Sequence, residues 1–326
     1  VYKFRQSHKD ELKVVADGGT GTIKIFTTYR NVGYLVEKRE ELKAIFSYCK
    51  DLGLMVSVHA EDDQIITEIN DNWKGSYRPI DHAAMRPAEA EAAAILYVGG
   101  IAGELDMPVY IVHLSSRKGL EAVRELRSRG VEVICETTPH YLYLDSSCLE
   151  GEKGPLYVMT PPLRTKDDNL ALREAVANGE IQVVATDHCS FTYDQKLESH
   201  DCRTIFPGIP GTEELLPLVH TLALEQGMDL SKVVNLVSTG PAREFGIYPR
   251  KGSLLEGTDA DFILFDPKEE WVLTKDAVHS ASHYTPYEGM RVKGKVKKTF
   301  LRGRLIADEK NYYGRKGDGE FIEADR

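Results

Sequence analysis

The chain has 326 residues, of which 42% are hydrophobic and 28% are charged. That composition is typical of a folded globular protein and excludes wholesale disorder. Its 41 basic and 51 acidic residues give a formal net charge of −10, which argues against a nucleic acid or an anionic membrane surface as the main partner. No apolar run approaches the roughly 20 residues of a membrane helix. The five cysteines form no CxxC pair, so we expect reduced thiols and a cytoplasmic location.

Short, almost continuous apolar runs recur along the chain and predict strands that are buried on both faces. They cover residues 22–27, 54–59, 109–113, 131–136 and 181–187. Segments with helical spacing lie between them, including residues 37–52, 88–105 and 119–129. This alternation predicts a parallel α/β sheet.

The pattern changes after residue 250. Residues 252–267 and 292–306 indicate strands separated by turns, with no helix between them, and therefore a small β domain. The polar, glycine-rich segment 311–326 indicates an extended tail. We accordingly expect three parts, residues 1–250, 251–310 and 311–326.

Polar residues end or interrupt the apolar runs. His59, His113 and Asp187 end three of them, and Lys24 lies within the first. The carboxyl ends of parallel strands form the active-site face of both a TIM barrel and a doubly wound sheet. A lysine, two histidines and an aspartate at one rim favour the barrel.

These residue types suit a metal site. One histidine at a strand end is more often structural, but two of them with an aspartate are harder to dismiss. Neutral imidazole and carboxylate are the usual ligands of catalytic Zn²⁺, which activates water at neutral pH. Asp187 could be a ligand, a general base or a cap for the following turn.

Lys24 has two interpretations. An ammonium buried within an apolar strand is costly, so the side chain could reach the rim or extend outward. Alternatively, its amine could be carboxylated by CO₂ to an anionic carbamate that bridges two metal ions. The residues alone do not choose between these.

A rival zinc site would use His188, Cys189, His200 and Cys202. The residue types are suitable, but the two close pairs with regular spacing that mark a structural zinc site are missing.

Several motifs together resemble those of the cyclic amidohydrolases, in the same order along nearly the whole chain. They are TIKIFTTYRN, VHAED, YIVHLSS, ETTPHYLYLD, MTPPLR, ATDHCSF, GIPGTEE, GPAREFGIYPRKG, GTDADFILFDP and HYTPYEGM. DHCSF and YTPYEGM are most similar to dihydropyrimidinases and hydantoinases.

The resemblance implies a metal-dependent (β/α)8 barrel with a small β domain. It implies hydrolysis of a hydantoin or dihydropyrimidine ring to an N-carbamoyl amino acid. Carboxylated Lys24 would bridge two zinc ions. His59 and His113 would hold the more exposed ion, while Asp187 would bind the other and act as the base. Family members commonly form tetramers, so we expect a homo-oligomer.

The resemblance also implies substrate contacts. Tyr29 would stabilise the oxyanion, and the segments at Thr160, Pro207 and Ile209 would contact the amide edge of the ring, largely through backbone groups. Pro207 stands where the family usually has asparagine, and Thr160 where it usually has serine.

One family motif is absent, because no HxH pair occurs in the sequence. The five apolar runs would therefore be the fourth to eighth barrel strands, and we expect the family's N-terminal part to be lacking. One metal ion or none, and poor hydrolysis, are then expected. The alternatives are a catalytically incompetent fragment or a non-catalytic scaffold protein, and the retained metal ligands argue against the scaffold.

Overall fold

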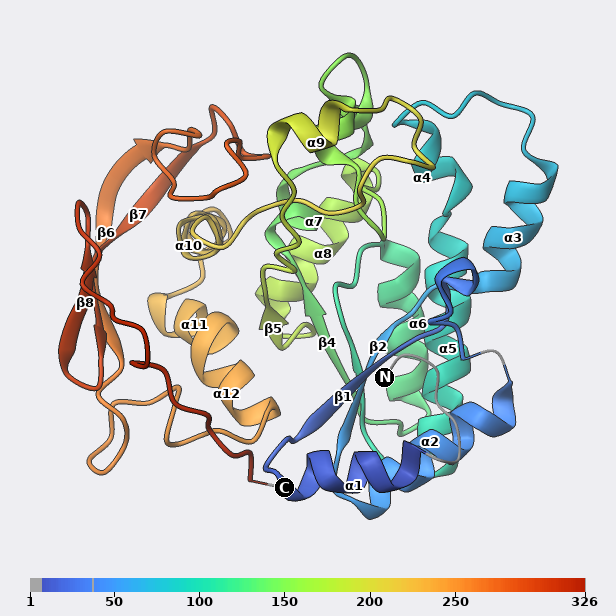
Figure 1. Cartoon of the computed structure of the whole chain (residues 1–326), viewed down its shortest axis with the longest axis horizontal. Coiled ribbons are helices and arrows are strands. Elements are labelled where there is room, and N and C mark those ends of the chain that lie inside the picture. Colours follow the sequence, from blue (N-terminus) through green and yellow to red (C-terminus); the bar gives the residue numbers. More distant parts are fainter. Residues whose placement is uncertain (1–7, 37, 326) are drawn as a thin grey trace.

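A parallel sheet forms the centre of the computed structural model, which describes residues 8–36 and 38–325 (Figure 1). Its five strands follow the chain in the order β1-β2-β3-β4-β5. They are β1 (Thr22–Phe26), β2 (Met55–His59), β3 (Val109–Ile111), β4 (Val133–Thr137) and β5 (Val183–Val184). Each strand falls on one of the predicted apolar runs. The predicted parallel arrangement is confirmed, and the carboxyl ends of all five strands meet at one edge.

Helices alternate with these strands as predicted. They are α1 (Lys9–Asp17), α2 (Arg39–Asp51), α3 (Asp63–Asn72), α4 (Asp81–Met85), α5 (Ala88–Glu104), α6 (Arg117–Ser128), α7 (Pro139–Tyr143), α8 (Lys166–Asn178), α9 (Tyr193–Leu197), α10 (Leu215–Glu225), α11 (Leu230–Val234) and α12 (Gly240–Glu244). Single turns of other helix types occur at Arg30–Val32, Ser146–Leu149, Gly154–Tyr157 and Asn235–Thr239. Of the predicted helix 37–52, residue Glu37 lies outside the described residues.

Side-chain caps fix where two of the covering helices begin. Ser116 accepts a hydrogen bond from the backbone N–H of Gly119 at 3.0 Å at the start of α6. Thr165 and Asp168 form a reciprocal capping box at the start of α8, which satisfies backbone donors that have no partner within the helix. The neighbouring helices α2, α5, α6 and α8 pack side by side on one face of the sheet.

The core has two unequal parts. The larger lies between the sheet and its covering helices and includes Ile25, Val58, Ile95 and Leu120. The smaller lies on the other face, where Tyr110, Val112, Ile134 and Val183 pack together with Phe245 at the end of α12. Burial on both faces is confirmed for β3 and β5, but the prediction is wrong for β1. In β1, Ile23 and Ile25 are buried while the alternate residues are half-buried, because the smaller cluster does not reach them.

A second, antiparallel sheet has the order β6-β7-β8 and comprises β6 (Phe262–Val272), β7 (Arg291–Leu301) and β8 (Arg304–Asp308). The strand predicted at 252–267 begins later, because Gly252 and Gly257 adopt left-handed turns with φ of 77° and 88°. It then continues past Pro267, where the register shifts between Asp266 and Glu270, since proline has no N–H to donate to a regular ladder.

The tail after β8 returns to the parallel sheet (Figure 1). The backbone N–H of Ala324 donates to the carbonyl of Gly19 at 2.8 Å, and that of Asp325 donates to Gly246 at 2.7 Å. The expected division at residues 250 and 310, and the expected absence of three earlier strands, stay predictions. In the described part of the chain, no helix has both the length and the apolar character needed to cross a membrane.

Candidate metal and substrate site

A cavity of about 140 Å³ opens where the strands of the parallel sheet end. Every residue that the family resemblance assigns to metal or substrate binding lines it: Lys24, Tyr29, His59, His113, Thr160, Asp187, Pro207 and Ile209. Phe26, His140, Met159, Cys189 and Gly208 complete its wall. The topology therefore brings together residues that are widely separated in the sequence.

The two histidines form the centre of this cavity. His59 ends β2, and His113 follows β3 by two residues. Their rings converge, with Nδ1 of His59 2.9 Å from Nε2 of His113. Both are 2% exposed, and burial lowers the pKa of each ring. The rings are therefore neutral at pH 7 and can offer lone pairs.

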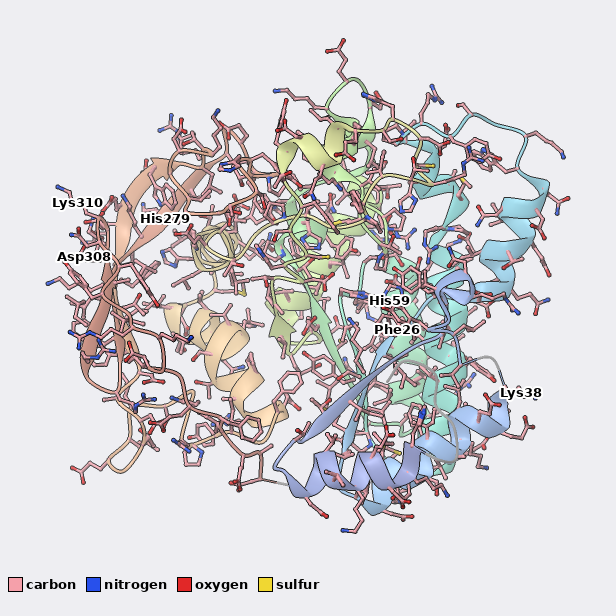
Figure 2. All side chains as sticks on the ribbon, in the orientation of Figure 1. Phe26, Lys38, His59, His279, Asp308 and Lys310 are labelled. Atoms are coloured by element: carbon pink, nitrogen blue, oxygen red, sulfur yellow. The ribbon has the colours of Figure 1, made fainter. Side chains whose placement is uncertain are left out.

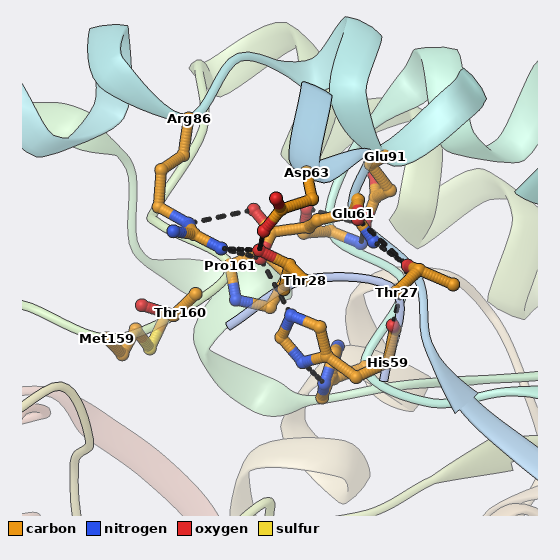
Figure 3. A network of polar contacts seen from close by, with 12 residues as sticks. Thr27, Thr28, His59, Glu61, Asp63, Arg86, Glu91, Met159, Thr160 and Pro161 are labelled. Carbon is orange, nitrogen blue, oxygen red and sulfur yellow. Dashed lines mark hydrogen bonds and ion pairs between the residues drawn. The ribbon is translucent and has the colours of Figure 1, made fainter. Parts of the chain in front are cut away.

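A buried ionic network fixes the orientation of His59 (Figure 3). The Nε2–H of His59 donates to Oε2 of Glu61 at 2.7 Å, and Arg86 contacts both oxygens of the same carboxylate at 3.1 and 2.7 Å. Burial alone would raise the pKa of Glu61, but the Arg86 guanidinium and His59 hold that pKa below its usual range. Because the carboxylate fixes the proton on Nε2, the lone pair of Nδ1 points toward His113.

Thr27 ties the ends of the first two strands together behind this network. Its hydroxyl donates to the carbonyl of Glu61 at 2.8 Å and accepts from the N–H of the same residue at 3.0 Å. Its own N–H donates to the carbonyl of His59 at 3.2 Å. A buried threonine at this position thus sets the spacing between β1 and the histidine of β2.

The backbone is strained at three of the cavity residues. Tyr29, His113 and Asp187 have φ of 69°, 42° and 43°, the left-handed region that side chains other than glycine rarely adopt. Such conformations persist where the surrounding structure enforces them, and they cluster at functional sites. Each of these residues follows a strand of the parallel sheet and turns its side chain into the cavity.

Lys24 and Asp187 come from the two border strands of the parallel sheet, β1 and the end of β5, and both line the cavity. Lys24 is half-buried in β1, with Nζ 5.3 Å from the centre of the Phe26 ring. Asp187 is exposed at the end of β5. Its partial desolvation raises the pKa of its carboxyl, and the ammonium of Lys24 opposes that rise. The two side chains therefore interact electrostatically across the cavity.

Tyr29 stands beside the histidine pair. Its ring centre is 5.1 Å from that of His59, and the Arg86 guanidinium lies 5.4 Å from the tyrosine ring centre. Burial, followed by the nearby Glu61 carboxylate, raises the pKa of Tyr29 well above its ordinary value. The phenol therefore stays protonated at neutral pH and can donate a hydrogen bond.

The donor set fits one metal ion. Nδ1 of His113 is buried and finds no hydrogen-bond partner among the described residues, while Nε2 points at Nδ1 of His59. Two neutral imidazoles whose nitrogens converge are suitable ligands for zinc. No group of three His, Cys, Asp or Glu side chains in residues 8–36 and 38–325 is arranged to hold a metal. A third ligand would therefore come from Lys24 or from movement of Asp187.

The residues of the rival zinc site are not brought together. Cys189 lines the cavity, but His200 is exposed and Cys202 is buried, with its Sγ 3.9 Å from Sδ of Met85. His188 instead accepts a hydrogen bond from the N–H of Gly211 through Nδ1. The interpretation of these residues as one site is wrong because they face different surroundings.

The sequence analysis missed Glu61, Arg86 and His140. Glu61 follows His59 by two residues within VHAED, and that spacing could have suggested a supporting carboxylate. Arg86 has no such signal, since it precedes α5 and reaches the network only through the fold. His140 is buried in the cavity wall, and its Nε2 has no partner within the described residues.

Comparison with known proteins identifies the family. Residues 5–306 match the model of the amidohydrolase family. The chain belongs to this family. It is 38% identical to a D-hydantoinase of Ralstonia pickettii over 96% of this chain and 70% of that protein. It is 37% identical to a D-hydantoinase of Rhizobium radiobacter, covering 96% of this chain and 69% of that one.

Solved structures extend the likeness to the fold. The chain superimposes on a D-hydantoinase with a TM-score of 0.94 at 37% identity, over 99% of this amidohydrolase and 72% of the solved chain. A dihydropyrimidinase of Brevibacillus agri gives a TM-score of 0.94 at 32% identity with the same coverage. The amidohydrolase fold expected from the sequence is confirmed, and this chain spans about 70% of the length of the curated relatives.

Proposed function

We propose that this amidohydrolase opens the ring of a hydantoin or dihydropyrimidine by hydrolysing a ring amide, which gives an N-carbamoyl amino acid. The observation that carries the proposal is the pair of neutral, convergent imidazoles in a cavity lined by all the expected residues. The names of the relatives, D-hydantoinase and dihydropyrimidinase, support the choice of substrate.

The metal ligands are proposed residue by residue. Nδ1 of His59, Nε2 of His113 and a carboxylated Lys24 would hold one zinc ion, and Lys24 with Asp187 would hold a second more weakly. Bound zinc would supply Lewis-acid catalysis and a hydroxide nucleophile at neutral pH. Because the first ion would have three protein ligands and the second only two, we expect one tightly bound ion per chain.

The other cavity residues would act on the substrate directly. The protonated phenol of Tyr29 would donate a hydrogen bond to the carbonyl oxygen as negative charge develops there. Asp187, whose raised pKa suits proton transfer, would take a proton and deliver it to the leaving ring nitrogen. Backbone groups at Thr160, Pro207 and Ile209 would orient the amide edge of the ring.

The remaining expectations follow from the family and stay proposals: a homo-oligomer, a cytoplasmic location, and neither nucleic acid nor membrane as partner. A non-catalytic scaffold is not favoured. A scaffold would have no need for strained backbone at Tyr29, His113 and Asp187, or for a buried carboxylate that orients His59.

The test is hydrolysis of hydantoin and dihydrouracil by the purified chain, followed as ureido product, together with measurement of bound zinc. Because no HxH pair is present, we expect slow but saturable hydrolysis that a chelator abolishes and zinc restores. His113→Ala should remove it. The matched control is His279→Ala, because His279 is an exposed histidine beside the second sheet and lies far from His59 (Figure 2). Absence of hydrolysis at every zinc loading, or full activity of His113→Ala, would overturn the proposal.

A further inference from the structure

Lys196 is a fully buried lysine outside the set of residues assigned above. It lies in the short helix α9, and its relative exposure is 0%. Its ammonium donates hydrogen bonds to three backbone carbonyls, those of Val158 at 2.7 Å, Phe206 at 2.7 Å and Gly208 at 3.0 Å. The three N–H donors of a lysine are therefore all used by main-chain acceptors.

Burial of the Lys196 ammonium costs free energy. None of the ion pairs in the described part of the chain includes Lys196, so its ammonium is held chiefly by the three carbonyl groups. Burial lowers the pKa of Lys196 to about 7. The three carbonyls oppose that change, because a neutral amine has only two N–H groups to donate. Burying an ammonium is costly unless it is hydrogen-bonded, and strongly perturbed pKa values cluster at functional sites.

The three carbonyls belong to the two backbone segments that wall the cavity. Val158 precedes Met159 and Thr160, whereas Phe206 and Gly208 flank Pro207. The N–H of Gly208 also donates to the carbonyl of Val158 at 3.0 Å. Lys196 therefore links the two segments at one contact, the joint, and its side chain does not line the cavity.

The second of these segments has few means of holding itself in place. Proline supplies no N–H, and the sequence FPGIPG contains two prolines within six residues. At Gly208 a Cβ atom would lie 2.8 Å from Sγ of Cys189, so the segment must press closely on the end of β5. The N–H of Cys189 donates to the carbonyl of Ile209 at 3.1 Å, which leaves the carbonyls at 206 and 208 to Lys196.

Helix α9 is itself anchored, and so it can hold the ammonium in a fixed place. Thr192 and Gln195 form a reciprocal capping box at its start. The N–H of Tyr193 donates to the carbonyl of Ser282 at 2.8 Å. The rings of Phe191 and Phe206 stack with their centres 4.9 Å apart, which adds a side-chain contact to the same joint.

We propose that Lys196 is a positioning residue for substrate binding, which holds the segments 158–160 and 206–209 at the spacing that their backbone groups need to engage the ring amide. The inference rests on the proposed function and names the group that shapes its substrate site. Lys196 touches neither the substrate nor the metal ligands. It acts through the carbonyls it binds.

The test compares Lys196→Met, which keeps the length of the side chain but removes the donors, with Lys196→Arg, which keeps the charge and donors. The matched control is Lys232→Met, because Lys232 also donates to a backbone carbonyl, that of Ala177, but lies away from the cavity. For Lys196→Met we expect KM for hydantoin to rise about tenfold, because the displaced segments would lose one or two of their backbone hydrogen bonds to the ring. The kcat and the bound zinc should be almost unchanged. Lys196→Arg should recover much of that loss.

Hydrogen exchange provides a readout that does not depend on activity. Lys196→Met should speed exchange of the Gly208 and Cys189 amides while leaving the amides of α5 unchanged. If that variant does not fold, Lys196→Gln takes its place with the same expectations. Unchanged KM and exchange, or faster exchange throughout the chain, would overturn the proposal. If the unsubstituted chain hydrolyses nothing, the proposed function fails, and localised exchange still decides whether Lys196 holds the joint.

Discussion

The two sides of the cavity are built in different ways. On the β2–β3 side, His59 and His113 are 2% exposed and Glu61 is wholly buried, and Arg86 completes an ionic network behind them. The second side comprises the residues of the two border strands, Lys24 on β1, which is half-buried, and Asp187 after β5, which is exposed. The first side is organised in advance, whereas the second depends on what occupies the cavity.

The charges of Lys24 and Asp187 explain why the second side needs a bound cation. As an ammonium, Lys24 favours the ionised form of Asp187. Carboxylation by CO₂ would replace that positive charge with a negative one facing another carboxylate. Two anions at close range disfavour each other unless a cation lies between them. We therefore expect carboxylation of Lys24 and metal binding to occur together.

Lys24→Ala should have the largest effect on metal binding and on hydrolysis. Without the carbamate, only the histidine pair remains for the first ion, so we expect bound zinc to fall below detection by elemental analysis and hydrolysis to vanish. Added bicarbonate should not restore either. The control is Lys43→Ala, which removes an exposed lysine paired with Glu104. Normal zinc content in Lys24→Ala would show that the histidine side binds metal alone.

Asp187→Asn should separate proton transfer from metal binding. The substitution keeps the size of the side chain but removes its basicity, so we expect kcat to fall by about 10²- to 10⁴-fold, the usual contribution of a general base. Zinc held by His59, His113 and carboxylated Lys24 should remain. Steady-state kinetics and zinc analysis of the same preparation measure both. A loss of zinc equal to the loss of activity would make Asp187 chiefly a ligand.

Glu61→Gln tests the buried network of His59, Glu61 and Arg86. A neutral amide cannot fix the proton of His59 as the carboxylate does, and it leaves Arg86 without its counter-charge. We expect zinc affinity to weaken about 10- to 100-fold, as for other groups that orient metal ligands. The control is Glu91→Gln, a buried glutamate bonded to Ser115 rather than to a histidine. Equal losses in the two variants would point to general destabilisation.

The smallest expected effect concerns pH and the buried ammonium of Lys196. Burial lowers the pKa of Lys196 to about 7, whereas an unfolded lysine titrates near 10.4. Between those values the unfolded chain binds more protons, so the free energy of unfolding should rise with pH by at most about 1.4 kcal/mol per unit. Urea unfolding at pH 6 to 8.5 should show this rise relative to Lys196→Met. A constant difference would contradict it.

The sequence predicted the strand ends well because period and residue type are local properties. The runs ending near His59, His113 and Asp187 mark both the strands and the cavity. It could not predict the partners of those residues. Arg86 reaches Glu61 only because the segment before α5 returns to the end of β2. Likewise, nothing in the residues around Lys196 indicates burial, because the carbonyls that enclose it come from two other segments.

The tail that joins Ala324 to Gly19 has a consequence for folding kinetics. Contacts between residues this far apart in the sequence close long loops, which cost entropy before the contacts stabilise anything. This pairing should therefore form late, after the parallel sheet. Interactions absent from the folding transition state change the rate of unfolding rather than that of folding. We therefore expect the backbone contacts of Ala324 and Asp325 to slow unfolding without changing the rate of folding.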